Sequence, residues 1–482
     1  MLKSMDLDRI AILFSAFIFL VYLSTLSISL DEEDAVHFAL GLKEFNVSKY
    51  QPHPPGFPVY IGLGMLFNAG LKNELLSLTC MGALFGALSV FVFYMLAREM
   101  LEREIALASS VLMAFTPLFW LSSLKAMSDI PALFFTLASM LFIYKYIKYN
   151  KPGYFYTGAL LAGISTGVRI HTLFILLPAL VYSAYMHKKG VRIRNKGFLL
   201  FVIAMLAWLL PVMLITGIPE YLSSAVSQFG FRVGKPHISI IGTELTPNYL
   251  ALKLFSSFYY FLLGGYGINL ASLGLFSTVL LFFMAALAIL FLKNVNLRDR
   301  RVLFLVSGVL IYLPVIFILL PPFSPRYLLV LIPLLSLIFT KALWNLKKPN
   351  QRYPLFGLLI LLVLTHSIFL ALEISTKSAP PVQLINYVNE NYGSYGSEGI
   401  IILNGFASKY FTYYHTDLTR LSETETDCER IKKIISENKT VLSIAGDKNC
   451  EGLQLELVST FKRDPRVHIK RSMINLYEFL LE

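Results

Sequence analysis

The chain has 482 residues, of which 56% are hydrophobic and only 15% are charged, and its mean hydropathy is +0.64. A soluble globular enzyme lies near or below zero on that scale, so the composition excludes one. The counts of 29 Gly, 22 Pro and 3 Cys are ordinary, which also excludes collagen-like, disordered and disulfide-rich chains. We therefore expect a mainly α-helical, polytopic membrane protein.

Eleven mostly apolar stretches are predicted to cross the bilayer, whose hydrocarbon core of about 30 Å needs roughly 20 helical residues. They cover residues 10–30, 75–97, 105–124, 130–146, 153–168, 172–186, 198–218, 268–292, 302–320, 327–340 and 354–372. Two shorter apolar stretches, 57–71 and 249–263, are predicted to form interfacial or re-entrant helices in outer loops.

The distribution of basic residues predicts the orientation. With the N-terminus inside, the inner segments carry 20 Lys and Arg and the short outer loops carry 9. This asymmetry predicts a multi-pass protein of the cell (plasma) membrane with a cytoplasmic N-terminus. The basic residues behind the net charge of +12 occur in these short runs between apolar stretches. Such a distribution does not indicate a nucleic-acid partner, which would need a continuous basic patch.

After the last apolar stretch the chain becomes polar and carries short α and β patterns. We expect strands over 399–403, 440–445, 453–462 and 473–481, and amphipathic helices over 381–391 and 429–437. The prediction is thus a transmembrane domain over 1–374 and a small extracytoplasmic α/β domain over 375–482. Cys428 and Cys450 would pair in an oxidising compartment, and two free thiols are the alternative.

Four consecutive acids, Asp31 to Asp34, follow the first predicted span. Acids commonly precede a helix because they complement its dipole, but one carboxylate at the membrane surface could also act as a general base toward a hydroxyl. Asp34 is expected to begin a short interfacial helix, with Asp31 to Glu33 more exposed. A divalent cation between Glu32 and Asp34 is possible but not implied.

Other polar residues stand at the predicted outer corners. The prolines around His53 fix a rigid turn that presents this side chain near the membrane surface, either as a structural group or as a ligand for a sugar or phosphate. Lys125, Arg169 and Arg326 lie in three further outer loops. Such cations can snorkel to lipid head groups, or they could together hold an anionic phosphate.

Several of these segments, in this order, resemble the membrane glycosyltransferases of the GT-C superfamily, especially the protein mannosyltransferase and aminoarabinose transferase branch, which is glycosyltransferase family 39-like. The matching segments are DAVHFAL at 34–40, HPPGFPVY at 53–60, SDIP at 128–131 and PRYLL at 325–329. The resemblance implies transfer of a sugar from a polyprenyl-phosphate donor to a hydroxyl of a protein, lipid or glycan on the outer face. It implies a single inverting displacement without a required cofactor.

The resemblance also implies roles for individual residues. Asp34 matches the catalytic carboxylate, and no residue is assigned to a metal. The implied substrate-binding residues are Asp31, Glu33, His37, His53, Lys125, Asp129, Arg169, His171, Arg326 and Tyr327. A transporter or flippase of a lipid-linked molecule is the alternative, and an inactive relative or assembly subunit is a third possibility. Ionisable side chains in the middle of the predicted spans would favour a transporter, and the sequence has no Asp, Glu, Lys or Arg there.

Overall fold

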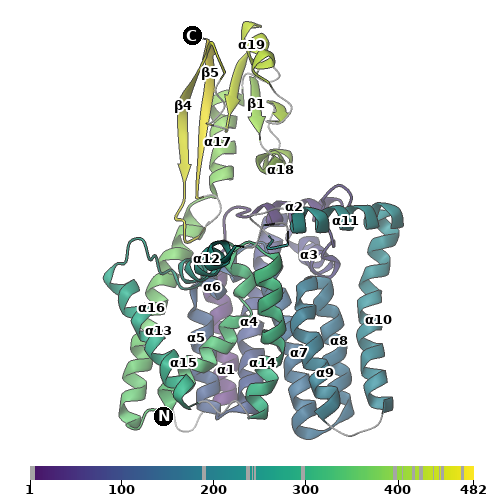
Figure 1. The fold of residues 1–482 in the computed structure, drawn as a ribbon, viewed down its shortest axis with the longest axis vertical. Coiled ribbons are helices and arrows are strands. Elements are labelled where there is room, and N and C mark those ends of the chain that lie inside the picture. The colour runs from purple at the N-terminus through teal and green to yellow at the C-terminus, as the bar shows by residue number, and fades with distance from the viewer. Residues whose placement is uncertain are drawn as a thin grey trace.

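The computed structural model places most of the chain in helices that run side by side, with a small sheet beyond one end of the bundle (Figure 1). The described residues are 6–186, 191–234, 239–241, 243, 246–294, 299–393, 399–403, 405–414, 418–422, 427–437, 439–444, 446, 450–467 and 472–481. The bundle helices are α1 (Leu7–Leu23), α4 (Glu74–Met100), α5 (Arg103–Phe115), α7 (Asp129–Tyr149), α8 (Pro152–Val168), α9 (Leu173–Met186), α10 (Val191–Thr216), α13 (Leu275–Asn294), α14 (Arg300–Leu319), α15 (Leu331–Trp344) and α16 (Pro349–Thr376).

Each predicted span corresponds to one of these helices, or to α5 together with α6 (Pro117–Leu124). In the described part of the chain, six helices are long and apolar enough to cross a membrane, or seven if the α5–α6 pair is one span. The helices α8, α9 and α15 have only 14 to 17 residues, which at about 1.5 Å per residue is shorter than the hydrocarbon core. The number of eleven spans therefore stays a prediction.

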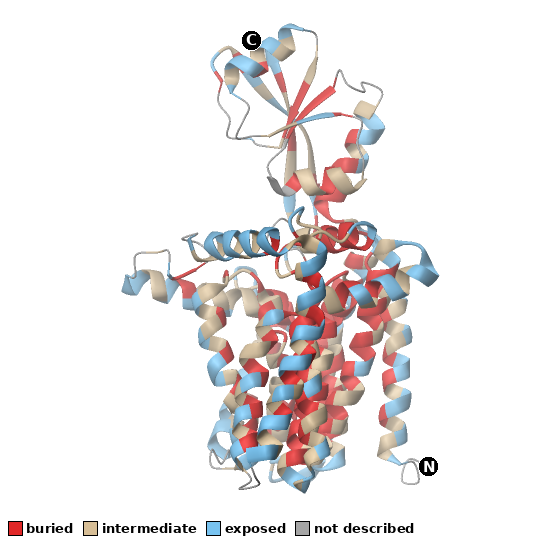
Figure 2. Cartoon of the chain, turned by 90° about the vertical axis from the view of Figure 1, so that its right-hand side faces the viewer, coloured by how far each residue is buried: buried red, intermediate tan, exposed pale blue. Residues whose placement is uncertain are grey.

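The burial pattern agrees with a bilayer around the bundle. The apolar windows of α4 and α7 are 61% and 72% buried, whereas those of α10, α13 and α14 are each 22% buried. The outer helices present large apolar side chains such as Leu214, Leu275 and Phe282 at the surface, as the mixed colouring of the outer helices in Figure 2 illustrates. An apolar surface of this extent needs a lipid environment.

Two predicted spans differ from the structure for identifiable reasons. The chain bends by 60° between α5 and α6, because Pro117 begins α6 and a proline lacks the N–H that would continue α5. The helix α1 ends at Leu23 rather than at residue 30. There Ser24 and Thr25 each donate a hydroxyl hydrogen bond to the carbonyl of Val21, and such local bonds compete with helix continuation.

A second set of helices lies at the end of the bundle that faces the sheet (Figure 1). These are α2 (Glu33–Lys43), α3 (Pro58–Leu71), α11 (Ile218–Gly234) and α12 (Pro247–Tyr266), together with the short 3-10 turns η2 (Ile170–Thr172) and η3 (Pro325–Leu328). The structure has helices at both stretches predicted as interfacial, α3 and α12. The helix α11 was not predicted, although apolar residues at 218, 222, 226, 229 and 233 have helical spacing.

The C-terminal part is a five-stranded mixed sheet with helices around it. Its elements are α17 (Pro380–Tyr392), β1 (Gly399–Leu403), α18 (Gly405–Tyr414), β2 (Thr419–Ser422), α19 (Cys428–Ser436), β3 (Thr440–Ser443), β4 (Leu453–Lys462) and β5 (Met473–Leu481). The strand order is β2-β1-β3-β5-β4, with parallel pairing of β1 to β2 and β3 and antiparallel pairing among β3, β5 and β4.

The predicted strands and helices of this part have counterparts in the structure, and α18 and β2 are additional. The strand predicted to end at Ala445 ends at Ser443 in β3, and Ala445 itself lies outside the described residues. The sequence missed β2 because it is only four residues long and half exposed, which leaves little apolar signal.

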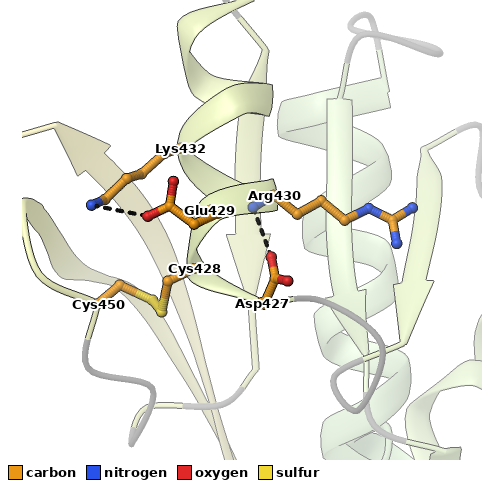
Figure 3. Close-up of a disulfide and its surroundings, with 6 residues drawn as sticks. All are labelled: Asp427, Cys428, Glu429, Arg430, Lys432 and Cys450. Atoms are coloured by element: carbon orange, nitrogen blue, oxygen red, sulfur yellow. Dashed lines mark hydrogen bonds and ion pairs between the residues drawn. A yellow bond between two sulfur atoms is a disulfide. The ribbon is translucent and has the colours of Figure 1, made fainter.

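Cys428 and Cys450 form a disulfide with Cα atoms 5.5 Å apart (Figure 3). It joins the start of α19, where Asp427 accepts a hydrogen bond from the Arg430 N–H, to the loop before β4. Of the two alternatives left open by the sequence, the structure shows the paired one. A bond of this kind persists in an oxidising compartment.

Removing this disulfide is expected to destabilise the C-terminal sheet. The two cysteines are 22 residues apart, and closing a loop of that size stabilises a fold by about 2–4 kcal/mol. In Cys428→Ser/Cys450→Ser, hydrogen exchange of the β3 and β4 amides in the full chain should therefore rise. Cys80→Ser is the matched control, because Cys80 is a free thiol in α4. Unchanged exchange, or alkylation of Cys428 and Cys450 in the unreduced wild type, would contradict the assignment.

Candidate active site

The four acids after α1 have four different partners, which distinguishes carboxylates that look alike in the sequence. The ion pairs are Asp31–Arg463 (2.6 Å), Glu32–Lys125 (3.7 Å), Glu33–His37 (3.7 Å) and Asp34–Arg326 (2.7 Å). Each carboxylate is thus directed toward a different part of the molecule. Glu32 and Asp34 meet two of the predicted cations, Lys125 and Arg326, and only Asp34 makes its contact at hydrogen-bond distance.

Asp34 lies in the first turn of α2, where the helix dipole favours an anion. Its Oδ2 accepts a hydrogen bond from a terminal nitrogen of Arg326 at 2.7 Å, and its Oδ1 is 3.9 Å from Nδ1 of His53. The Asp34 side chain remains 18% exposed, so a hydroxyl group can approach it. A carboxylate that a hydroxyl can approach has the geometry that a general base needs.

Asp31 is less exposed than Asp34, so the prediction that it would be the more exposed of the two is wrong. Its side chain is 1% exposed and is paired with the fully buried guanidinium of Arg463 from the C-terminal part. Asp31 also accepts a hydrogen bond from the hydroxyl of Ser29 at 2.9 Å. The sequence missed this pairing because Arg463 is more than four hundred residues away along the chain.

The proline-rich turn after α2 brings His53 close to Asp34. Gly56 closes the turn by donating its N–H to the carbonyl of His53. It has a φ of +94°, and a Cβ there would lie 2.9 Å from a methyl of Val47, so only glycine fits. The His53 ring packs against Phe57 and lies 5.5 Å from His37 between ring centroids.

Burial lowers the pKa of His53 from its ordinary value of 6.5 to about 3, although the nearby Asp34 acts in the opposite direction. The imidazole is therefore neutral at physiological pH, and it can donate one hydrogen bond and accept another. A neutral His53 suits contact with sugar hydroxyls better than charge neutralisation of a phosphate.

The free energy of unfolding is expected to fall as the pH drops below 6.5, in part because of His53. Between pH 6.5 and 3 this imidazole takes up a proton in the unfolded chain but not in the folded one. One such group reduces stability by up to about 1.4 kcal/mol per pH unit. Unfolding measured from pH 7.5 to 4.5 should show a shallower loss in His53→Gln than in the wild type. Equal slopes would mean that His53 is not buried as a neutral group.

Asp129 and Arg169 form a second buried pair next to the first. A terminal nitrogen of Arg169 donates to Oδ2 of Asp129 and to the hydroxyl of Ser128, both at 2.9 Å. The ring of Tyr327 lies between two guanidinium groups, with its centroid 5.4 Å from Arg169 and 5.3 Å from Arg326. The two arginines thus share Tyr327 as a neighbour, and Arg326 in turn contacts Asp34.

An open cleft of about 860 Å³, part of it solvent space, is lined by Asp34 and by residues of α11; we call it the α11 cleft. Its polar end is formed by Asp34, His53, Arg169, His171, Arg232 and Tyr327. Its remaining walls are largely apolar and come from α9, α11 and α14, with Phe174, Phe229, Val233, Val315, Ile316, Leu319 and Leu320. Cationic groups at one end of an apolar channel suit an amphiphile with an anionic head.

Burial lowers the pKa of His171, which lines the same cleft, and the neighbouring arginines lower it further. Its ring lies 5.6 Å from that of Tyr327. Arg232 is a lining residue that the sequence did not single out as a candidate. The sequence signal that could have found Arg232 is the amphipathic spacing of α11, which predicts a helix at the membrane surface instead of an irregular loop.

A second cavity of about 620 Å³ lies on the other side of Arg326; we call it the α6 cavity. Its walls come from α6, the segment before η3, the C-terminal part and the acidic residues 31–34 after α1, which we call the acidic loop. Its polar lining residues are Glu32, Ser122, Lys125, Asp129, Ser324, Arg326 and Arg466. Arg326 lines this cavity, and its ion-pair partner Asp34 lines the α11 cleft, so the Asp34–Arg326 pair links the walls of the two spaces.

Most of the predicted site residues therefore converge on these two spaces, but three do not. Asp31, Glu33 and His37 line neither the α11 cleft nor the α6 cavity. His37 is occupied by hydrogen bonding to the carbonyl of Tyr50 at 2.7 Å, and Glu33 extends toward His37. Their placement does not support substrate binding, because Glu33 and His37 contact the local structure around α2 and Asp31 is paired with Arg463. Among the described residues, no group of three or more His, Cys, Asp or Glu side chains is arranged to hold a metal ion.

The architecture is thus that of a helical membrane bundle with a carboxylate, several arginines and an amphipathic cleft at one end. A family model described as dolichyl-phosphate-mannose-protein mannosyltransferase matches residues 52–215, about a third of the chain. No curated protein sequence matches.

Solved structures with the same architecture include ArnT from Cupriavidus metallidurans. Its apo state gives a TM-score of 0.60 at 12% identity, covering 96% of this chain and 97% of that chain. Its complex with undecaprenyl phosphate gives 0.58 at 11% identity, covering 97% of each chain. The oligosaccharyltransferase of Archaeoglobus fulgidus, in complex with Zn and sulfate, gives 0.52 at 15% identity, covering 91% of this chain and 68% of that chain. The chain has the fold of GT-C membrane glycosyltransferases, which confirms the predicted resemblance.

Proposed function

We propose that the protein is a membrane glycosyltransferase that moves a sugar from a polyprenyl-phosphate donor to an acceptor hydroxyl. The observation that carries this proposal is the Asp34–Arg326 pair, which links the wall of the α11 cleft to that of the α6 cavity. A carboxylate next to a guanidinium can serve the two halves of the reaction at once. The carboxylate accepts the proton of the nucleophile, and the guanidinium stabilises the leaving phosphate.

The donor is assigned to the α11 cleft. Arg169 and Arg232 line its polar end, where bidentate guanidinium groups suit a phosphate. The apolar walls from α9, α11 and α14 suit the prenyl chain, which would enter sideways from the lipid. The complex of ArnT with undecaprenyl phosphate and the dolichyl-phosphate-mannose family model support a lipid phosphate of this kind.

The acceptor is assigned to the α6 cavity, which has a polar lining and borders the C-terminal part. The acceptor oxygen attacks the anomeric carbon of the sugar while its proton passes to Asp34. The bond from the anomeric carbon to the phosphate oxygen breaks in the same step, and the electron pair leaves with the polyprenyl phosphate. One displacement from the opposite face inverts the anomeric configuration, and the step requires neither a cofactor nor a metal.

The site is proposed to face the outside of the cell membrane, with the N-terminus in the cytoplasm. The Cys428–Cys450 disulfide supports this orientation for the C-terminal part, as does the excess of Lys and Arg in the predicted inner segments. The chain enters the bundle at the end away from the sheet (Figure 1), so the two ends of the bundle are assigned to opposite membrane surfaces.

The test is transfer of labelled sugar in nanodiscs from a panel of dolichyl- and undecaprenyl-phosphate sugars to proteins, lipids and glycans of the native membrane. Labelled product from one donor, with inverted configuration, supports the proposal and identifies the sugar. If no donor yields product but a labelled lipid-linked sugar crosses a sealed bilayer containing the protein, the function is that of a flippase, the alternative that the sequence left open.

A further inference from the structure

The segment of the C-terminal part that follows β4 reaches into the acidic loop. Arg463 directly follows β4, and its backbone N–H donates to the carbonyl of Ser472 across the hairpin at 2.8 Å. Its guanidinium donates to Oδ1 of Asp31 at 2.6 Å and to the carbonyl of Ile374, at the end of α16, at 3.1 Å. One side chain thus joins the sheet, the last bundle helix and the loop that carries Asp34.

This junction is buried and extends through a connected set of hydrogen bonds. The side chains of Arg463 and Asp31 are 0% and 1% exposed. Ser29 donates its hydroxyl to Asp31 and accepts the backbone N–H of Ala379, each at 2.9 Å. Charges withdrawn from water in this way keep a defined geometry, because any displacement would leave a charge without its partner.

A second contact joins the C-terminal part to the acidic loop, this time at Glu32, one residue closer to Asp34 than Asp31 is. Lys125 donates to the carbonyl of Val467 at 2.8 Å and lies 3.7 Å from the carboxylate of Glu32. The segment 463–467 is therefore held at both ends against the outer loops. It also contributes Arg466 and Val467 to the wall of the α6 cavity.

We propose that Arg463 is a positioning residue for the transfer reaction, which holds Asp34 in place through its buried ion pair with Asp31. Asp31 is three residues before Asp34, and α2 begins between them at Glu33. Anchoring Asp31 fixes where that helix starts and hence the direction of the Asp34 carboxylate toward Arg326. The inference rests on the proposed function and adds that the C-terminal part is required for catalysis rather than for acceptor binding alone.

The test compares Arg463→Met, Arg463→Lys and the double variant Asp31→Asn/Arg463→Met in nanodiscs. The double variant removes both charges, so it avoids the unpaired buried charge that makes the single change prone to misfolding. We expect kcat of the double variant to fall about 10- to 100-fold, since a displacement of about 1 Å costs that much. The donor KM should change less than about twofold, because the arginines of the α11 cleft are untouched. Arg463→Lys should recover part of kcat.

Hydrogen exchange gives a readout that does not depend on transfer. Amides of residues 29–36 should exchange faster in the double variant, measured without donor, than in the wild type. Lys432→Met is the control, because it breaks an exposed ion pair with Glu429 in the same part of the chain (Figure 3). Wild-type kcat and wild-type exchange in the folded double variant would overturn the inference. Absence of transfer by the wild-type protein overturns the proposed function instead, and the exchange data still decide whether Arg463 orders the loop.

Discussion

Asp34→Asn is expected to lower kcat for sugar transfer by about 10²- to 10⁴-fold, the range that a general base contributes. The amide has nearly the shape of the carboxylate but cannot accept the proton of the acceptor hydroxyl. The Asp34 carboxylate lies 2.7 Å from Arg326 and borders the α11 cleft, so the loss should appear in kcat, while donor binding through Arg169 and Arg232 persists. Initial rates at saturating donor, together with polyprenyl-phosphate binding, measure the two effects separately.

Glu44→Gln is the control for this change. Glu44 lies just after α2 and makes an exposed ion pair with Lys49, so its loss removes a carboxylate from the same region without touching either cavity. Wild-type kcat in folded Asp34→Asn would contradict the proposed base. In that case Glu32 and Asp129 would be the next candidates, because both line the α6 cavity.

Arg326→Met is expected to reduce kcat/KM by about 10²- to 10³-fold, the usual loss when one donor to a developing anion is removed. The leaving phosphate gains negative charge as its bond to the sugar breaks, and Arg326 is next to the carboxylate that receives the proton. Arg326→Lys should be intermediate, because an ammonium keeps the charge but lacks the planar fork of a guanidinium. Rates with donors that differ in leaving-group phosphate pKa would measure the charge that Arg326 stabilises.

Lys49→Met is the matched control for the loss of a cation at this end of the bundle, because Lys49 is 57% exposed and paired with Glu44. Unchanged kcat/KM in Arg326→Met would assign the phosphate to Arg169 and Arg232 alone. A loss that is equally large in the control would instead indicate a general electrostatic effect on the surface.

Hydropathy predicted the helical bundle because the length and apolar composition that allow a helix to span lipid are local properties of each stretch. It failed where backbone hydrogen bonding decides the outcome. Pro117 separates α5 from α6, and hydroxyls at Ser24 and Thr25 accompany the end of α1. The helix α11 was missed although its apolar residues have helical spacing, and β2 was missed because it is short.

The candidate site could be predicted only in part. The acidic run, the turn around His53 and the cations at the outer corners were visible as residue types at the ends of predicted spans. Their pairing was not, because an ion pair depends on which loops meet in space. The sequence therefore grouped Asp31 with Asp34, whereas in the structure Asp31 pairs with Arg463 and Asp34 pairs with Arg326.

The sequence by itself determined that the chain is a helical membrane protein with a polar C-terminal part and a polar outer surface resembling GT-C glycosyltransferases. These properties follow from composition, period and local motifs, each of which is encoded within some twenty residues. Only the tertiary structure decided which of the four adjacent carboxylates meets Arg326, that Arg232 lines the same cleft as Asp34, and that Arg463 pairs with Asp31. Those outcomes depend on contacts between segments hundreds of residues apart, and no local pattern in a chain specifies such contacts.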